Sequence, residues 1–225
     1  YLSWSIAPRW DIDFIGNISR NNYDFIPSDR NTKFGTAEDV KEFKVYFDGQ
    51  EKDYFHTYFG AFTITHKFNK FNNLYFNISA FETRESETFD ISGEYWLNNE
   101  GDNQSLGIGK YMEHARNRLT VSVFAYALKG NSRFTSHILQ YGISYKNEKV
   151  NESMKEWEMR DSAGYSLPNV DERLELIYNL RSSHQLKGGR LEMFLQDTYR
   201  KEYDEGELVI NYGARLSHWS VNNEW

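Results

Sequence analysis

Apolar and polar residues alternate along eight segments of the chain, and turn-forming residues bound each segment. Strict alternation is typical of a strand whose two faces meet different surroundings. The segments are 2–8, 12–19, 57–68, 74–80, 119–125, 139–146, 191–196 and 208–217. Consecutive segments form hairpins around short turns near residues 10, 71, 131 and 204. We therefore expect an all-β, antiparallel fold of about eight strands.

The connections between these hairpins are much longer than the turns within them. They run roughly over residues 22–56, 84–116 and 148–189. Loops of more than about 15 residues are uncommon in compact soluble domains. Short turns at one end and long loops at the other are typical of outer-membrane barrels, whose short turns are periplasmic and whose long loops are extracellular. The pattern therefore predicts a segment of an antiparallel transmembrane β-barrel.

The two faces of the predicted strands also fit a barrel wall. Apolar stripes would face lipid, and we expect Ile78 and Val121 to lie in them. The polar stripes, which suit a wet or plugged lumen better than a dry core, hold Asp13, Asn17, Asn77, Gln140, Lys146, Asn211 and Arg215. Aromatic residues near the short turns predict a girdle at the membrane interface and comprise Trp10, Phe68, Phe71, Tyr75, Phe134, Tyr199 and Tyr203.

Composition removes several other classes of protein. The 225 residues carry a net charge of -7 without a basic stripe, so we expect no nucleic-acid partner. The chain has no cysteine and therefore no thiolate chemistry. Mean hydropathy is -0.75, and no apolar run approaches the roughly 20 residues of a spanning helix. A barrel tolerates this hydropathy because only alternate strand residues face lipid.

No catalytic or cofactor-binding constellation is recognisable. The G-I-G-K sequence at 107–110 lacks the first glycine of a phosphate loop, because Gln104 stands there, and Tyr111 replaces the required Ser or Thr. The histidines do not have zinc-site spacing. We predict no enzyme, no cofactor and no metal site. The acidic pairs Asp48/Glu51, Glu85/Glu87, Asp90/Glu94 and Asp171/Glu172 leave Ca²⁺ binding open, although solvated loop charges explain them equally well.

Three segments resemble one family of outer-membrane proteins: KVYFDGQEKDYFHTYFGAF at 44–62, ESETFDISGEYWL at 85–97 and EWEMRDSAGYSLP at 156–168. Together with YMEHARNRL at 111–119 and FLQDTYR at 194–200, they are similar to TonB-dependent receptors of Bacteroidetes. The similarity extends along nearly the whole chain. It implies the barrel region of a large receptor in which a carboxypeptidase-regulatory-like domain and a plug precede the barrel.

The resemblance implies a role and a set of partners. Residues 1–225 would be part of a single barrel domain of the 22-stranded, plugged class, with the plug and the TonB box outside this chain. The receptor would reside in the outer membrane of a Gram-negative bacterium and import a nutrient captured by its extracellular loops. Its implied partners are outer-membrane lipid, the rest of the barrel and plug, the TonB complex through parts outside this chain, and, as a further candidate, a surface lipoprotein.

Six residues of the predicted long loops are candidates for ligand contact: Tyr46, Tyr95, Trp96, Trp157, Arg160 and Tyr165. Aromatic faces and a guanidinium could grip a sugar, a peptide or a chelate, but the same residues could anchor the loops by internal packing. Two other functions remain open. The chain could be a soluble β-sandwich that binds carbohydrate, or a small closed outer-membrane barrel with a structural role.

Overall fold

The computed structural model describes residues 1–36, 38–99, 105–161 and 174–223. These residues form one antiparallel sheet of nine strands. The strands are β1 Leu2–Ala7, β2 Trp10–Phe25, β3 Arg30–Thr36, β4 Asp39–Asn69, β5 Asn72–Asn99, β6 Ser105–Arg133, β7 His137–Arg160, β8 Glu175–Tyr203 and β9 Gly206–Trp219. In the described part of the chain, no helix is long and apolar enough to cross a membrane. The predicted all-β, antiparallel class is confirmed.

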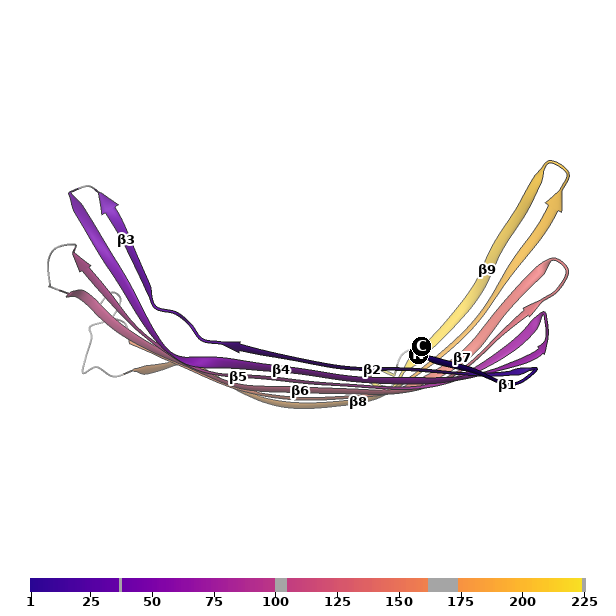
Figure 1. Cartoon of the computed structure of the whole chain (residues 1–225), viewed down its shortest axis with the longest axis horizontal. Coiled ribbons are helices and arrows are strands. Elements are labelled where there is room, and N and C mark those ends of the chain that lie inside the picture. Colours follow the sequence, from indigo (N-terminus) through magenta and orange to yellow (C-terminus); the bar gives the residue numbers. More distant parts are fainter. Residues whose placement is uncertain (37, 100–104, 162–173, 224–225) are drawn as a thin grey trace.

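Eight strands follow one another across the sheet in the order β1-β2-β4-β5-β6-β7-β8-β9, and β3 pairs only with β4. Each of the eight alternating segments of the sequence lies in one of these eight strands, except that the last residue of the first segment, Pro8, falls in the turn after β1. The prediction missed β3, whose sequence RNTKFGT has polar residues at both alternating positions. Figure 1 shows an open, curved sheet whose two ends rise on the same side, with β3 at one end and the β8–β9 turn at the other.

The prediction of long loops between the hairpins is wrong, because most of the residues assigned to those loops extend the strands. Residues 39–56 belong to β4, and its ladder with β5 runs from Lys41 opposite Asn99 to Asn69 opposite Asn72. Likewise, 84–99 and 105–116 extend β5 and β6, and 148–160 and 175–189 extend β7 and β8. Both faces of these extensions carry polar residues, so the sequence loses its two-residue hydrophobic period although the backbone pairing continues.

One predicted turn is also displaced. Residues 129–132 were expected to form the turn of the third hairpin, but they belong to β6, which pairs with β7 as far as Arg133 opposite Ile138. The chain reverses at 134–136, where the Phe134 backbone N–H donates to the His137 backbone carbonyl at 2.8 Å. Gly130 and Asn131 favour a turn locally, but here they continue the ladder, because Gly130 makes room for the ring of Tyr141 on the neighbouring strand.

The cross-strand register divides the residues between two faces. Ile78 lies opposite Phe62 on β4 and Tyr126 on β6, and we call the face that carries these three the outer face. Val121 lies opposite Thr83 and therefore belongs to the other face, the inner face. The expectation that Ile78 and Val121 share a lipid-facing stripe is wrong. β6 is apolar at both alternating positions from Val123 to Leu128, so its sequence could not indicate which set continues the stripe of β5.

Large apolar side chains form a continuous band on the outer face beside the short turns. It includes Ile12, Phe14, Ile64, Phe62, Phe76, Ile78, Leu128, Tyr126, Ile143, Tyr145, Met193, Leu191 and Leu216. The exposed fractions of Ile18, Tyr126 and Leu216 are 73%, 43% and 49%. Ala115 is the single buried apolar residue in the described part of the chain. The sheet is therefore one layer that presents its apolar band outward.

This apolar band crosses the sheet obliquely. Its run covers nine residues on β2, Trp10 to Ile18, and nine on β9, Leu208 to Leu216. The row through Phe14 reaches β9 at His218, six residues beyond the centre of the β9 run at Tyr212. With ~3.3 Å per residue and ~4.8 Å between strands, this offset over six strand steps inclines the strands by about 35° to the band normal. Strands of closed barrels tilt by a similar angle.

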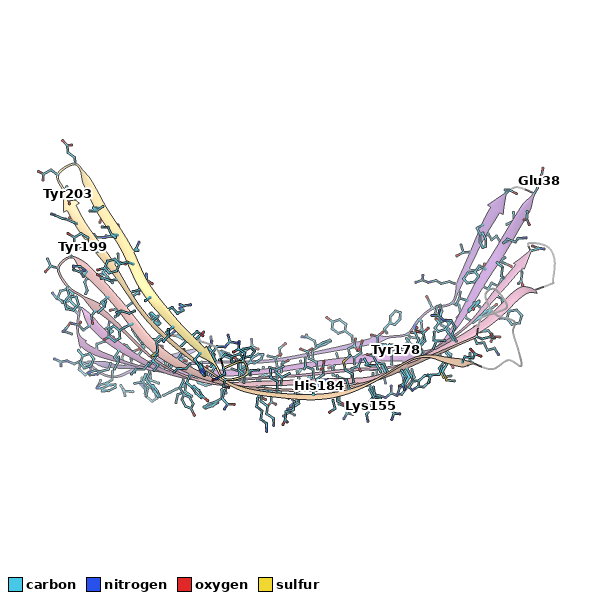
Figure 2. All side chains as sticks on the ribbon, turned by 180° about the vertical axis from the view of Figure 1, so that it is seen from behind. Glu38, Lys155, Tyr178, His184, Tyr199 and Tyr203 are labelled. Atoms are coloured by element: carbon cyan, nitrogen blue, oxygen red, sulfur yellow. The ribbon has the colours of Figure 1, made fainter. Side chains whose placement is uncertain are left out.

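The polar residues predicted to face a lumen all lie on the inner face. They are Asp13, Asn17, Asn77, Gln140, Lys146, Asn211 and Arg215. Trp10, Tyr199 and Tyr203 lie on the outer face near the turns, as a girdle requires, whereas Tyr75 lies opposite Lys129 on the inner face and does not join it. Figure 2 shows Tyr178, an inner-face residue, on the concave side and Lys155, an outer-face residue, on the convex side.

Candidate functional site

Carboxylates gather on the inner face of β4 to β7, on the side of the apolar band away from the short turns. Five inner-face rows, spaced two residues apart along each strand, run from Thr57–Thr83–Val121–Val150–Leu186 to Gly49–Ile91–Glu113–Glu158–Tyr178 and define this region. Its inner face carries Glu51, Asp53, Glu85, Glu87, Glu113, Glu152, Glu156 and Glu158. No Lys or Arg occupies an inner-face position of these rows. We call this region the inner acidic wall.

Three of these carboxylates come close together at the β4–β5 ladder. One oxygen each from Glu51, Asp53 and Glu87 lie within 4.8 Å of one another. Asp53 and Glu87 are direct cross-strand partners, an arrangement that like charges destabilise. The Asp53 Oδ1 atom is buried and accepts no hydrogen bond from the described residues. Oxygen sets of this kind suit hard cations, so among the described residues these three are the group that could hold a divalent ion.

A hydrogen-bond network ties the wall across four strands. The side-chain amide of Asn117 on β6 donates to Glu87 Oε2 at 2.8 Å and to Glu156 Oε1 at 2.5 Å. The Tyr178 hydroxyl of β8 donates to Glu156 Oε2 at 3.1 Å. The backbone N–H of Lys155 donates to Asn117 Oδ1 at 3.3 Å. Asn117 therefore fixes carboxylates of β5 and β7 relative to one another.

A shallow depression of about 310 Å³ lies on this wall. Phe55, Leu119 and Met154 supply its apolar lining. Its acidic lining comes from Asp53, Glu85, Glu87 and Glu152. An apolar surface surrounded by carboxylates is suited to a ligand that combines a positive charge with an apolar part.

The crowding of carboxylates shifts their acidity. Burial, followed by the charges of Asp53 and Glu87, raises the pKa of Glu51. Burial and the nearby charge of Glu158 raise the pKa of Glu113. On the outer face, the pKa of Asp90 shifts in the opposite direction. Burial opposes the ionisation of Asp90, but hydrogen bonds from Arg116 and His114 outweigh the effect of burial and lower its pKa.

Replacing Glu51 with Gln is expected to flatten the pH dependence of stability. The pKa of Glu51 is raised in the folded state, so the folded protein binds the proton of Glu51 more tightly than the unfolded chain does. The resulting contribution to the free energy of unfolding is fully present below the unfolded-state pKa and is lost as pH rises through the folded-state pKa. The free energy of unfolding of Glu51→Gln should therefore fall less than that of the wild type between acidic and neutral pH. Denaturant unfolding of the full-length protein at a series of pH values measures this.

Glu42 provides a control of opposite sign. A hydrogen bond from Asn31, and then one from Lys44, lower the pKa of Glu42, so its stabilising contribution is present above its unfolded-state pKa and is lost as pH falls. Glu42→Gln should remove stability at neutral pH and leave the acidic end unchanged. If Glu51→Gln and Glu42→Gln changed the pH profile in the same direction, the assigned shifts would be wrong.

Five of the six predicted ligand residues lie within the described residues, and the expectation that these five lie in loops is wrong, because all five belong to strands and are divided between the two faces. Tyr46 on β4, Trp96 on β5 and Trp157 on β7 belong to the outer face. Tyr95 on β5 and Arg160 on β7 belong to the inner face. Tyr165 lies outside the described residues. Neighbours in a strand point to opposite faces, so Tyr95 and Trp96 cannot contact one ligand on a single face.

The residues of this set have structural neighbours of their own. The Trp157 ring stacks on His114, with 5.0 Å between ring centroids and 10° between planes. The Tyr95 hydroxyl donates to the backbone carbonyl of Asp161 at 3.2 Å, and its ring covers Gly109. Arg160 forms an ion pair with Glu158. Tyr95 and Arg160 are the members of the set that share a face with the inner acidic wall.

Sequence reasoning did not identify the inner acidic wall. Glu85/Glu87 and Glu156/Glu158 are spaced by two residues, which indicates a shared face if the segment is a strand, but those segments were interpreted as loops. Of the acidic pairs considered for Ca²⁺, Glu85/Glu87 lies on the wall. Asp48/Glu51 is split between the faces, Asp90/Glu94 is on the outer face, and Asp171/Glu172 lies outside the described residues.

Comparison with known proteins adds no family assignment. No protein-family model matches the chain. No curated protein matches it at a significant level. Function is therefore inferred from the two faces of the sheet.

Proposed function

We propose that this chain forms part of the barrel wall of an outer-membrane TonB-dependent receptor, which binds a nutrient outside and imports it through a plugged barrel. The observation that carries the proposal is the oblique apolar band on the outer face, backed at the same level by a polar inner face. Nine-residue runs such as Leu208 to Leu216 match the 9–11 residues with which a tilted strand crosses a bilayer.

The energetics of the apolar band favour a lipid environment. Soluble monomers rarely expose contiguous apolar patches above a few hundred Å². The band here extends across β2 to β9, and its members include Phe76, Leu128 and Ile143, which are all exposed. Hydrocarbon would cover this surface without a second protein layer. The polar inner face would meet a water-filled or plugged lumen.

The strands are longer than a bilayer requires. β4, β5, β6 and β8 have 31, 28, 29 and 29 residues, whereas about 10 residues suffice to cross the hydrocarbon region. Under this proposal, the excess forms a wall that stands outside the membrane, away from the short periplasmic turns. The inner acidic wall then lines the mouth of the barrel, where its charge favours cationic ligands over anionic ones.

The proposed partners follow from the edges and faces of the sheet. β1 and β9 have unpaired outer edges among the described strands, and a lipid-exposed sheet edge is untenable. Further strands of the barrel would pair there, and a plug would face the inner side. Energy coupling would come from the TonB complex through parts outside this chain, and a surface lipoprotein would contact the mouth.

Two other architectures receive less support. A soluble carbohydrate-binding sandwich requires two packed sheets, whereas the described residues form a single sheet. A small closed barrel requires β1 to pair with β9, and the sheet is open between them in the described part of the chain.

Membrane fractionation of the full-length product tests the proposal. We expect the protein in the outer-membrane fraction, extractable only with detergent, and migrating faster on a denaturing gel before heating than after it. The physical reason is that the hydrogen-bonded wall of a closed barrel resists detergent until it is heated. A protein that is soluble without detergent, with no heat-dependent shift, would contradict the proposal.

A further inference from the structure

The two faces of the sheet carry opposite charge in the region of the inner acidic wall. On the outer face of β4 to β8, five rows alternate with those of the inner acidic wall and run from Tyr58–Glu82–Ser122–Lys149–Lys187 to Gln50–Asp90–His114–Trp157–Asn179. These outer rows hold Lys52, Arg84, Arg116, Arg118, Lys149, Lys155, Arg181 and Lys187. Outer-face acids in these rows of β4 to β8 are Glu82 and Asp90. We call the eight cations the outer basic belt.

Most of the belt lacks an anionic partner within the described residues. Arg84 pairs with Glu82 at 2.6 Å, and Arg116 pairs with Asp90. No described carboxylate forms an ion pair with the remaining six, which are Lys52, Arg118, Lys149, Lys155, Arg181 and Lys187. All of these except Lys52 are exposed. Their positive charge is therefore available to an external anion.

Like charges face one another directly in the belt. Lys149 lies opposite Lys187, and Lys155 lies opposite Arg181 on the same pair of strands. Such pairs destabilise a sheet unless an anion sits between them. The inner acidic wall cannot supply that anion, because its carboxylates point to the other side of the sheet. The two cationic pairs lie at different positions along β7 and β8, so they favour a ligand that carries negative charges at more than one position along the strands.

The position of the belt points to the source of that anion. Lys149 lies four residues along β7 from Tyr145 in the apolar band, so it stands about 13 Å from the last large lipid-facing ring at ~3.3 Å per residue. Cations at this border attract the phosphates of anionic lipids. Lys155 lies six residues further, about 20 Å higher along the strand, which exceeds the depth of an ordinary phospholipid headgroup layer.

We infer that the outer basic belt binds the phosphates of an anionic glycolipid whose phosphorylated sugar headgroup reaches up the wall of the receptor. This inference rests on the proposed function, because it requires the outer face to meet lipid. Lys149 and Lys187 bind the phosphates nearest the hydrocarbon boundary. Lys155 and Arg181 bind anionic groups higher in the same headgroup. The bound lipid offsets the repulsion within each cationic pair.

Titration of the full-length protein in nonionic detergent with purified lipopolysaccharide tests the inference. Lys149→Gln/Lys187→Gln should bind about 30-fold more weakly than the wild type at low salt, as expected for two cations near an anionic lipid. Lipopolysaccharide whose phosphates have been removed enzymatically should bind both proteins equally weakly. Lys70→Gln/Lys201→Gln removes two cations on the short-turn side of the band and should bind like the wild type.

A second double variant tests the height of the bound headgroup. Lys155→Gln/Arg181→Gln should weaken binding of lipopolysaccharide but leave binding of phosphatidylglycerol in mixed micelles unchanged. Equal binding by the wild type and both belt variants, or equal binding of phosphorylated and dephosphorylated lipid, would overturn the inference. If the protein still fractionates with the outer membrane and shifts on heating, only the inference fails; a soluble wild-type protein would overturn the proposed function itself.

Discussion

If the outer apolar band meets lipid, as we propose, replacing Ile78 with Arg is expected to destabilise the protein by about 2–4 kcal/mol, the cost of a cation near the bilayer midplane. Ile78 lies in the middle of the outer apolar band, between Phe62 and Tyr126. A guanidinium there would displace lipid contacts and find no carboxylate among its neighbours in that row. The change in the free energy of unfolding is measured by titrating the full-length protein with urea in lipid vesicles under conditions where unfolding is reversible.

Ser79 supplies a control at the same depth. It follows Ile78 on β5 but faces inward, opposite Ala61 and Ala125, where small neighbours leave room for a longer side chain. Ser79→Arg should cost far less than Ile78→Arg, because its side chain lies on the polar inner face. Val121→Arg should also avoid the lipid penalty, since Val121 is on the inner face. Equal losses for Ile78→Arg and Ser79→Arg would contradict the assignment of the faces.

Replacing Gly49 with Ala is expected to cost about 1–3 kcal/mol from the strained backbone conformation alone. Gly49 has a φ of 114°, a conformation that residues with a Cβ rarely adopt. An added Cβ would lie 1.9 Å from the backbone carbonyl oxygen of Asp90, so the β4–β5 ladder would have to shift. This change lies two residues from Glu51 and should also disturb the inner acidic wall.

Gly60 on the same strand provides the matched control. A Cβ added there would have no atom within 4 Å, and its φ is not in the positive region. Gly60→Ala should therefore leave the free energy of unfolding within about 0.5 kcal/mol of the wild type. Comparable destabilisation by Gly49→Ala and Gly60→Ala in denaturant titrations would show that the conformation of Gly49 is not the cause.

Alternation predicted the strands best where one face is apolar. The segments 12–19 and 74–80 were predicted to be strands and lie in β2 and β5. Apolar residues at every second position indicate a strand with one face covered by protein or lipid. The same criterion failed beyond residue 84, where outer cations such as Arg84 alternate with inner acids such as Glu85. Charge of opposite sign also has a two-residue period, but a hydrophobic pattern does not detect it.

Residue types alone did not reveal the candidate site. Glu51, Asp53 and Glu87 come together because Asp53 is opposite Glu87 in the β4–β5 register, and nothing within either segment specifies that pairing. The aromatic candidates were selected as loop residues. Strand geometry separates them, with Trp96 on one face and Tyr95 on the other.

The sequence by itself determined the class of fold and the presence of eight of the nine strands, because these follow from local alternation and turn chemistry. The tertiary structure decided which stripe of β6 continues that of β5, how far each strand extends, and which charges share a face. Those properties depend on the register between strands, and a shift of one residue would move every side chain to the opposite face. The outer apolar band, the inner acidic wall and the outer basic belt are therefore products of pairing.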